Sequence, residues 1–364
     1  MRIPPVSVPP AVLRSALRSR ARLQNLVDRG VPAEVALLDL TWGVQRTAVA
    51  GALVTSGLAD ALGGDSRHPA ELADELGLDR DVTVRVLRGA VIARLVAWDR
   101  DGRVSLSRIG APLRQDHRSS VASWVATQAS QAVLASYGQL DAQLREGAEP
   151  SGVRRATGGS LWEHFSAQPA EGAQFGRAMR ELTAIDLDAL VSGYPWPSSG
   201  VICDVGGGIG TLLAAILASR TAARGILIDG PDVLAEAEGF LQARGLAERV
   251  DRRSGDLFAH LDARADVYVM KWILHDWNDA ACRDILSRLR ETMPGGAKLV
   301  TIDQHLDPEH PDGVASIADV HMMAVCEGGR ERSPDQVHAL MRDAGLKPGK
   351  VHHAGLHMLV EGVA

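Results

Sequence analysis

The sequence is poor in aromatic residues, which make up only 4% of its 364 positions. Proteins that bind single-stranded nucleic acid use repeated aromatic stacking platforms, so that function is not expected here. The chain also has no large excess of charge of either sign, because it contains 39 lysines and arginines and 45 aspartates and glutamates. Without a strongly basic face, nucleic acid is not an expected partner.

Cysteines are also few, namely Cys203, Cys282 and Cys326. Their odd number and wide spacing match neither a disulfide framework nor a zinc site. This usage predicts a protein of the reducing cytoplasm.

No membrane or export segment is expected. The longest charge-free run, Ser119–Leu140, is rich in Ser, Gln and Thr, which excludes a membrane helix. The proline-rich residues 1–10 lack the apolar core of a secretory signal. Arginines then recur, and a solvated helix face explains them better than a transit peptide; they are Arg14, Arg18, Arg20 and Arg22.

The length predicts two to three domains, at about 150 residues each. Residues 11–62 read as helices, and residues 34–62 are too apolar to face water, so we expect them to be buried, as in a homodimer. Residues 68–106 read as helix, helix and hairpin, the winged-helix pattern. Residues 119–192 are helical again, and the turn-rich 193–200 mark the last domain boundary.

A winged helix can bind DNA, so a DNA-binding regulator is one alternative. Its second helix, Val82–Leu95, offers three arginines but no Asn, Gln or Lys for reading base edges. Packing or dimerisation is the better interpretation of this region.

From Val201 onward, short buried strands alternate with helices. This pattern predicts a doubly wound, mostly parallel sheet, and therefore the α/β fold class. Such sheets bind ligands beyond the carboxyl ends of their strands. The expected strands are 201–205, 225–229, 250–255, 265–272 and 298–303, with more in 350–362.

A glycine-rich turn, Asp204–Leu212, follows the first of these strands. A dinucleotide site would need Gly or Ala where Thr211 or Leu213 stands, and the lysine of a phosphate-binding loop is missing. An acidic residue just before the glycines is instead typical of S-adenosylmethionine (SAM) sites. A plain tight turn is the alternative interpretation.

Acidic residues also follow the next two strands. Asp229 could accept hydrogen bonds from both hydroxyls of a ribose, although a helix cap, a role open to Asp232 too, is an alternative. Asp256 could accept from an adenine amino group, with Leu257 covering the ring.

His275 lies in Met270–Trp277, at the carboxyl end of the fourth strand. Asp303 and Glu331 lie downstream, each where it could approach that edge of the sheet. A histidine held by carboxylates is a general base whose tautomer is fixed.

These motifs together resemble the SAM-dependent small-molecule O-methyltransferases, which include plant caffeate, animal hydroxyindole and bacterial aromatic-polyketide enzymes. The resemblance runs from about Glu34 to Gly345. It implies a homodimer formed through an N-terminal winged-helix domain (1–110), a helical connecting region that contributes to the substrate pocket (111–195), and a Rossmann-like SAM domain (196–364).

The resemblance also implies roles for single residues. Asp204, Gly206 and Gly208 would hold SAM around its methionine part, Asp229 its ribose, and Asp256 and Leu257 its adenine, while Lys271 would help to close the site. His275 would be the catalytic base, flanked by Glu331 and by Asp303, which is one methylene shorter than the glutamate of the plant enzymes. The substrate pocket would include Phe175, Met179, Met322 and Met323, and His321 nearby has no assigned role.

We therefore expect methyl transfer from SAM to a hydroxyl of an aromatic small molecule, of the polyketide type, with S-adenosylhomocysteine as the product. No metal is expected. A second alternative is a family member that has drifted to another tailoring reaction and keeps SAM as a structural ligand. The identity of the acceptor and the hydroxyl that is methylated stay open.

Overall fold

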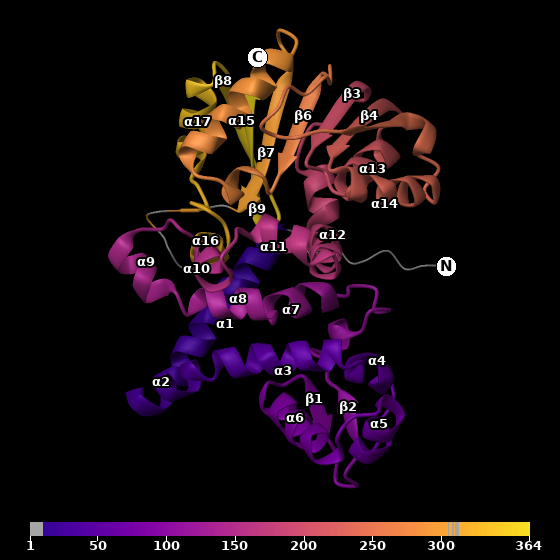
Figure 1. Cartoon of the computed structure of the whole chain (residues 1–364), viewed down its shortest axis with the longest axis vertical. Coiled ribbons are helices and arrows are strands. Elements are labelled where there is room, and N and C mark those ends of the chain that lie inside the picture. Colours follow the sequence, from indigo (N-terminus) through magenta and orange to yellow (C-terminus); the bar gives the residue numbers. More distant parts are fainter. Residues whose placement is uncertain (1–9, 305, 308, 310–312) are drawn as a thin grey trace. The chain divides into compact units, whose positions relative to one another are not determined.

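The computed structural model of the chain describes residues 10–304, 306, 307, 309 and 313–364; the side chains of residues 10–15, 17 and 18 are outside that description (Figure 1). The described chain forms two compact units. The first contains Gln139–Leu161 and Asp186–Ala364, together with residues 10–17. The second contains Arg18–Gly138 and Trp162–Ile185.

The first unit is built on a seven-stranded sheet of order β5-β4-β3-β6-β7-β9-β8. The first five strands in this order pair in parallel, and β9 is antiparallel to both of its neighbours, β7 and β8. The predicted α/β class is confirmed, and the tail supplies two strands. The strands are β3 Ser199–Val205, β4 Ala222–Asp229, β5 Val250–Ser254, β6 Val267–Lys271, β7 Lys298–Gln304, β8 Lys347–Ala354 and β9 His357–Val363.

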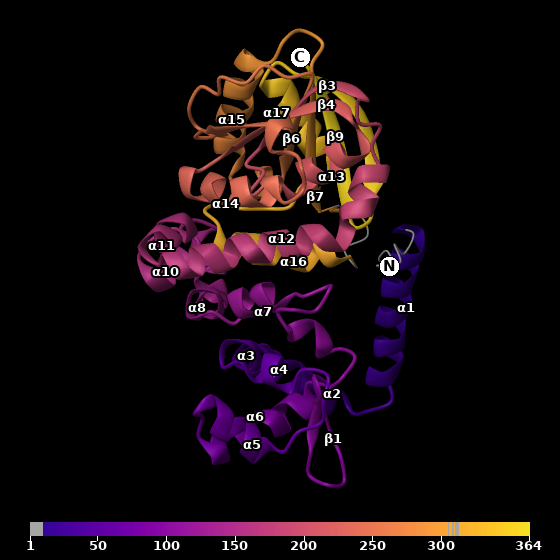
Figure 2. The ribbon, with the colours of Figure 1, turned by 90° about the vertical axis from the view of Figure 1, so that its right-hand side faces the viewer.

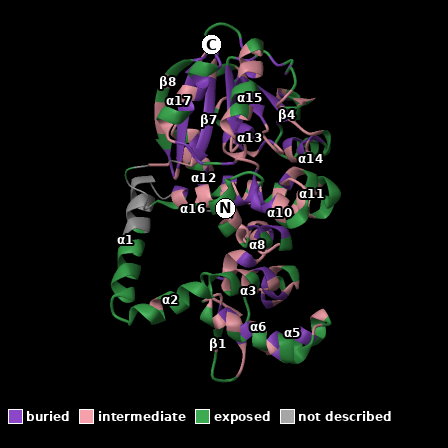
Figure 3. Ribbon diagram, turned by 60° about the vertical axis from the view of Figure 1, so that its left-hand side comes forward, coloured by how far each residue is buried: buried purple, intermediate pink, exposed green. Residues whose placement is uncertain are grey.

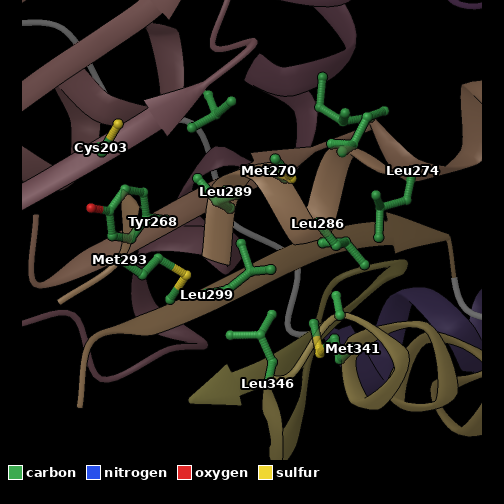
Figure 4. Packing of buried hydrophobic residues seen from close by; sticks show 14 of the residues in the cluster. Cys203, Tyr268, Met270, Leu274, Leu286, Leu289, Met293, Leu299, Met341 and Leu346 are labelled. Atoms are coloured by element: carbon green, nitrogen blue, oxygen red, sulfur yellow. The ribbon is translucent and has the colours of Figure 1, made fainter. Parts of the chain in front are cut away.

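Both faces of this sheet are buried, which explains why its strands read as continuous apolar runs. Along β6, Tyr268 and Met270 enter one core while Val267 and Val269 enter the other, as the two-residue period of a strand requires. Helices α15 (Asp279–Thr292) and α17 (Pro334–Asp343) cover the first core, part of which is drawn in Figure 4. The second core is covered by α13 (Thr211–Ser219), α14 (Pro231–Gln242) and the end of α12 (Pro169–Ser192) (Figure 2).

Three further helices of this unit matter for the site. They are α9 (Leu140–Glu146), α10 (Gly152–Thr157) and α16 (Val314–Val325). Buried Gln143 of α9 donates to the backbone oxygen of Met323 at 2.9 Å, and this bond ties α9 to α16.

The second unit has the expected order of helix, helix and hairpin. Helix α5 (Pro69–Leu76) is followed by α6 (Arg80–Ile92) and by strands β1 (Val96–Trp98) and β2 (Val104–Leu106), which pair from Val96↔Leu106 to Trp98↔Val104. Residues 99–102 join the two strands, and Gly102 there has φ +77°. The unit's other elements are the rest of α1 (Pro10–Asp28), α2 (Ala33–Thr41), α3 (Gly43–Thr55), α4 (Leu58–Leu62), η1 (Ala111–Leu113), α7 (Ala122–Gln128), α8 (Gln131–Tyr137), most of α11 (Leu161–Ala167) and the start of α12.

The apolar stretch 34–62 is only partly buried within one chain. Leu53 of α3 is fully buried, whereas α2 has no buried residue, and Leu37, Leu38 and Leu40 are each more than 60% exposed. Figure 3 shows α2 coloured as exposed along most of its length. Within the single chain α2 is therefore exposed, and its expected burial in a homodimer stays a prediction. Of the four N-terminal arginines, Arg20 and Arg22 are exposed, and the side chains of Arg14 and Arg18 lie outside the described part, as do residues 1–9.

Candidate active site

The glycine turn begins where β3 ends and leads into α13. Gly206 donates its N–H to the backbone oxygen of Ile228 at 2.8 Å, which ties the turn to β4. Gly210 takes the cap position of α13 at φ +83°, a conformation that favours glycine. The turn brings its backbone close to the carboxyl ends of β3 and β4.

Asp204 lies beneath this turn, with 2% of its surface exposed. A Cβ on Gly207 would lie 2.5 Å from the carboxyl carbon of Asp204, so only glycine fits above it. Burial raises the pKa of Asp204 to about 7, and the ammonium of Lys271 acts in the opposite direction. Asp204 therefore supports the turn from below.

Asp229 ends β4 and faces the same turn. Its two carboxylate oxygens accept the N–H groups of Gly208 and Gly230, each at 2.8 Å. Burial raises the pKa of this carboxyl, and those two bonds act to lower it. Each oxygen keeps a lone pair for a further donor, such as a ribose hydroxyl. The first turn of α14 is capped at Gly230 without a side chain, so Asp232 is not the N-cap.

The other predicted cofactor residues lie on the neighbouring strand ends. Asp256, after β5, is exposed, and its Oδ1 accepts the N–H of Phe258 at 2.9 Å. Leu257 packs against the core below. Lys271, at the end of β6, places its Nζ 2.8 Å from the centre of the Trp272 ring. Burial lowers the pKa of Lys271 well below its usual range, while Asp204, Asp303 and Asp186 act to raise it.

His275 is on a single 3₁₀ turn, η3 (Leu274–Asp276), just beyond β6. Its Nδ1 lies 2.9 Å from Oε1 of Glu331, a carboxylate with 1% exposure. The carboxylate can only accept, so Nδ1 carries the hydrogen and Nε2 of the neutral ring has a free lone pair. The nearest carboxylate to Nε2 is that of Asp276, at 3.5 Å, which is too long for a hydrogen bond.

Three carboxylates set the charge of this histidine. Burial would lower the pKa of His275, but the hydrogen bond and charge of Glu331, with Asp276 and Asp303, raise it to about 9. Asp303 is buried at the end of β7, and its Oδ1 has no hydrogen-bond partner in the described structure. Burial raises the pKa of Asp303 to about 7, while the positive charge of His275 acts to lower it. Asp303 thus affects the pKa of His275 by its charge, whereas Glu331 also forms a hydrogen bond with the ring.

The predicted pocket residues fall in different units. Met322 of α16 is buried, and Met323 lines a cavity of about 330 Å³ together with Asp319 and Arg330 in the first unit. His321 is on the same helix, and burial lowers its pKa to about 4. Phe175 and Met179 belong to the second unit, where the ring of Phe175 lies 4.9 Å from that of Phe165.

Sequence reasoning missed the residues that support Glu331 and the histidine turn. Asp319 of α16 accepts the N–H of Glu331 at 2.8 Å. Arg332, directly after Glu331, is 3% exposed and donates to the backbone oxygen of Leu274 at 2.6 Å. The only signal for Arg332 was its place beside Glu331 in the run Gly328–Ser333. Across the part of the chain that the structure describes, no group of three metal-ligating side chains occurs.

A parallel sheet with a glycine turn after its first strand, an acidic residue after its second and a histidine after its fourth is the arrangement expected of a SAM-dependent methyltransferase. Comparison with known proteins agrees. Residues 137–347 match the family model described as an O-methyltransferase domain, which covers more than half of the chain. The chain belongs to this O-methyltransferase family and is a SAM-dependent O-methyltransferase.

Several relatives cover most of the chain. The O-demethylpuromycin O-methyltransferase of Streptomyces alboniger is 32% identical over 88% of this chain and 85% of its own length. The mitomycin biosynthesis 6-O-methyltransferase of Streptomyces lavendulae is 30% identical over 86% and 89%. A solved O-methyltransferase from neocarzinostatin biosynthesis, in complex with SAM and 2-hydroxy-5-methyl naphthoic acid, has a TM-score of 0.77 and 28% identity over 88% and 96% of the two chains.

Proposed function

We propose that this enzyme methylates a hydroxyl of an aromatic natural product of the polyketide type, with His275 as the general base. The observation that carries the proposal is the His275–Glu331 pair, because the carboxylate at Nδ1 leaves Nε2 free to accept a proton. The mitomycin and neocarzinostatin relatives named above act in biosynthesis, and the neocarzinostatin enzyme binds a hydroxylated naphthoic acid, which supports an aromatic acceptor.

The residues at the sheet edge fit SAM as the methyl donor. Gly208 has open space where a Cβ would be, so a ligand can approach the turn closely. Asp229 has accepting capacity left for ribose hydroxyls, and Asp256 is exposed next to the half-buried Leu257, as an adenine site needs. We assign Asp204, Gly206, Gly208, Asp229, Asp256, Leu257 and Lys271 to this site.

SAM supplies a methyl group that is already activated by its sulfonium, so the chain mainly has to align the two reactants. A phenol has a pKa near 10 and is mostly protonated at neutral pH. His275 Nε2 takes the hydroxyl proton as the oxygen–carbon bond forms and the carbon–sulfur bond breaks, leaving S-adenosylhomocysteine. Glu331 then stabilises the imidazolium, and Asp303 adds negative charge nearby. Met322 and Met323 of the first unit are proposed to line the acceptor pocket, and the pocket role of Phe175 and Met179 in the second unit stays a prediction from the resemblance.

The test is transfer of a radiolabelled methyl group from SAM to 1,4-dihydroxy-2-naphthoic acid, a hydroxylated aromatic compound that is bound together with S-adenosylhomocysteine in a solved structure of the neocarzinostatin enzyme. His275→Ala should lower the rate by about 10²–10⁴ and leave SAM affinity unchanged. His260→Ala is the matched control, because His260 is an exposed histidine of the same unit. Transfer by His275→Ala at the wild-type rate would show that alignment alone suffices.

Two alternatives predict different outcomes. A family member that has drifted to another reaction would bind SAM without transferring its methyl group to any hydroxyl. A DNA-binding regulator would shift DNA in a mobility assay, although Arg80 of α6 is already paired with Asp74. The intact His275–Glu331 pair favours methylation over both.

We also propose a homodimer through the N-terminal helices, because α2 exposes Leu37, Leu38 and Leu40 together. Sedimentation should give twice the chain mass of 38.7 kDa, and Leu38→Glu with Leu40→Glu should reduce it to that of a monomer. Leu144→Glu is the control, since Leu144 is an isolated exposed leucine of α9. A monomeric wild type at micromolar concentration would contradict this assembly.

The cytoplasm remains the proposed location. Cys203, Cys282 and Cys326 are all free and buried thiols, which a reducing compartment keeps as they are. Within the described residues, none of the helices combines the length and the apolar character that a membrane span needs.

A further inference from the structure

Three consecutive residues hold the turn that carries His275. Arg330 donates its backbone N–H to the backbone oxygen of His275 at 2.8 Å, and Glu331 binds the ring of the same residue. Arg332 donates from its guanidinium to the backbone oxygens of Leu274, at 2.6 Å, and Trp277, at 2.8 Å. Residues 330–332 therefore hold the backbone and the ring of His275 together with the carbonyl groups of Leu274 and Trp277.

The turn cannot fix itself. Its own backbone bonds are long, at 3.2 Å from Asp276 to Ile273 and 3.4 Å from Trp277 to Leu274. A single 3₁₀ turn has poor hydrogen-bond geometry and only a few bonds to hold it. The thiol of Cys282 also lies near both carbonyls, but its single S–H can donate to the oxygen of either Leu274 or Trp277, and it is a weak donor. The planar guanidinium is the strong donor at both positions.

Four of the five N–H groups of Arg332 donate to acceptors inside the protein. Its Nε and Nη2 donate to Oδ1 of Asp279 at 3.0 and 2.7 Å, and Asp279 is the first residue of α15. Burial acts to raise the pKa of Asp279, but the hydrogen bond and charge of Arg332 lower it. The buried charge of Arg332 is thus balanced inside the protein, and its role must be directed at the turn rather than at an anionic substrate.

We propose that Arg332 is a positioning residue of the methyl transfer, which acts by keeping Nε2 of His275 aligned with the acceptor hydroxyl. This inference depends on the proposed role of His275. A displacement of about 1 Å in a reacting group can cost on the order of 10² in rate. Lysine at this position keeps the charge but, as a point donor, cannot reach both carbonyls and Asp279 together.

The test is a double-mutant cycle with His275→Ala. Arg332→Lys in the wild-type background should lower kcat by about 10², with KM for SAM unchanged and full SAM binding per chain. In the His275→Ala background the same change should have no further effect, because there is no base left to misalign. A purely structural role would lower activity by the same factor in both backgrounds, and that result would overturn the inference.

Two variants complete the design. Arg283→Lys is the matched control, because Arg283 is an exposed arginine of α15 that pairs with Asp343 at 2.9 Å and does not touch the turn; it should leave kcat unchanged. If Arg332→Lys does not fold, Asp279→Asn takes its place in the cycle, since it removes the partner that orients the guanidinium. Additive losses with Asp279→Asn would equally overturn the inference.

Failure of the proposed function has a different pattern. If His275→Ala alone has the wild-type rate, the base assignment is wrong, whatever Arg332→Lys does. If His275→Ala is slow and Arg332→Lys is as fast as wild type, His275 remains the base and Arg332 does not position it.

Discussion

Two turns at the same edge of the sheet are built in opposite ways. The glycine turn at 206–210 is held by the backbone of β4 and by Asp229, its immediate neighbours in the sheet. The histidine turn at 274–276 depends on the side chains of Glu331 and Arg332, more than fifty positions further along the chain. The part of the site assigned to SAM is thus held by the adjacent strand. The part that carries the base is held by side chains from a distant stretch of the chain.

Among the residues assigned to SAM, substitution of Asp229 should have the largest effect on SAM binding. Asp229→Ala removes the acceptor for ribose hydroxyls and for the Gly208 N–H, and should weaken SAM binding by about 2–3 kcal/mol, a factor of roughly 30 to 150 in Kd. Asp232→Ala, on the exposed first turn of α14, should leave Kd unchanged. Calorimetric titration measures both, and equal effects would mean that Asp229 only shapes the turn.

The ionisation of His275 should be visible in the pH profile of kcat/KM. Because Glu331, Asp276 and Asp303 raise the pKa of His275 to about 9 against the effect of burial, most of the free enzyme is protonated at pH 7. Only the neutral ring accepts a proton, so kcat/KM should rise by about 50-fold from pH 7 to pH 9 and then level off.

Substitution of the carboxylates sharpens this prediction. Glu331→Gln removes the charge in contact with Nδ1, so the rise should move to clearly lower pH with the same acceptor. Asp303→Asn removes a negative charge that does not contact the His275 ring, so it should shift the rise in kcat/KM by less. It should also cost less activity than His275→Ala. A profile identical in all three proteins would assign the rise to the phenol instead.

The smallest effect concerns the stability of the glycine turn. Gly207→Ala would place a Cβ 2.6 Å from Leu227 and 2.5 Å from the carboxyl carbon of Asp204, and should lower the free energy of unfolding by about 1–3 kcal/mol. In Gly230→Ala the new Cβ would have no heavy atom within 4 Å, and φ at this position is −64°, which alanine adopts readily. This substitution should therefore be neutral or slightly stabilising. Denaturant titration distinguishes them, and equal stability would mean that Asp204 and Leu227 move aside.

The sequence by itself determined the α/β class, the positions of the strand ends and the order of chemical groups along the sheet edge. It could do so because strand periodicity and glycine turns are local patterns, and because parallel strands bring their carboxyl ends to one edge. Asp204, Asp229 and His275 could therefore be assigned to that edge from local patterns alone. The resemblance to O-methyltransferases extended this to Glu331.

Only the tertiary structure decided which groups touch. It placed Glu331 in contact with Nδ1 of His275, left Asp303 Oδ1 without a hydrogen bond to any of the described residues, and revealed Arg332 as the donor to the carbonyls around the histidine turn. It also left α2 exposed in the single chain, although its composition predicts burial. Hydrogen bonds between residues far apart in the chain depend on how the loop after α16 packs on the loop after β6, and no local pattern encodes that packing.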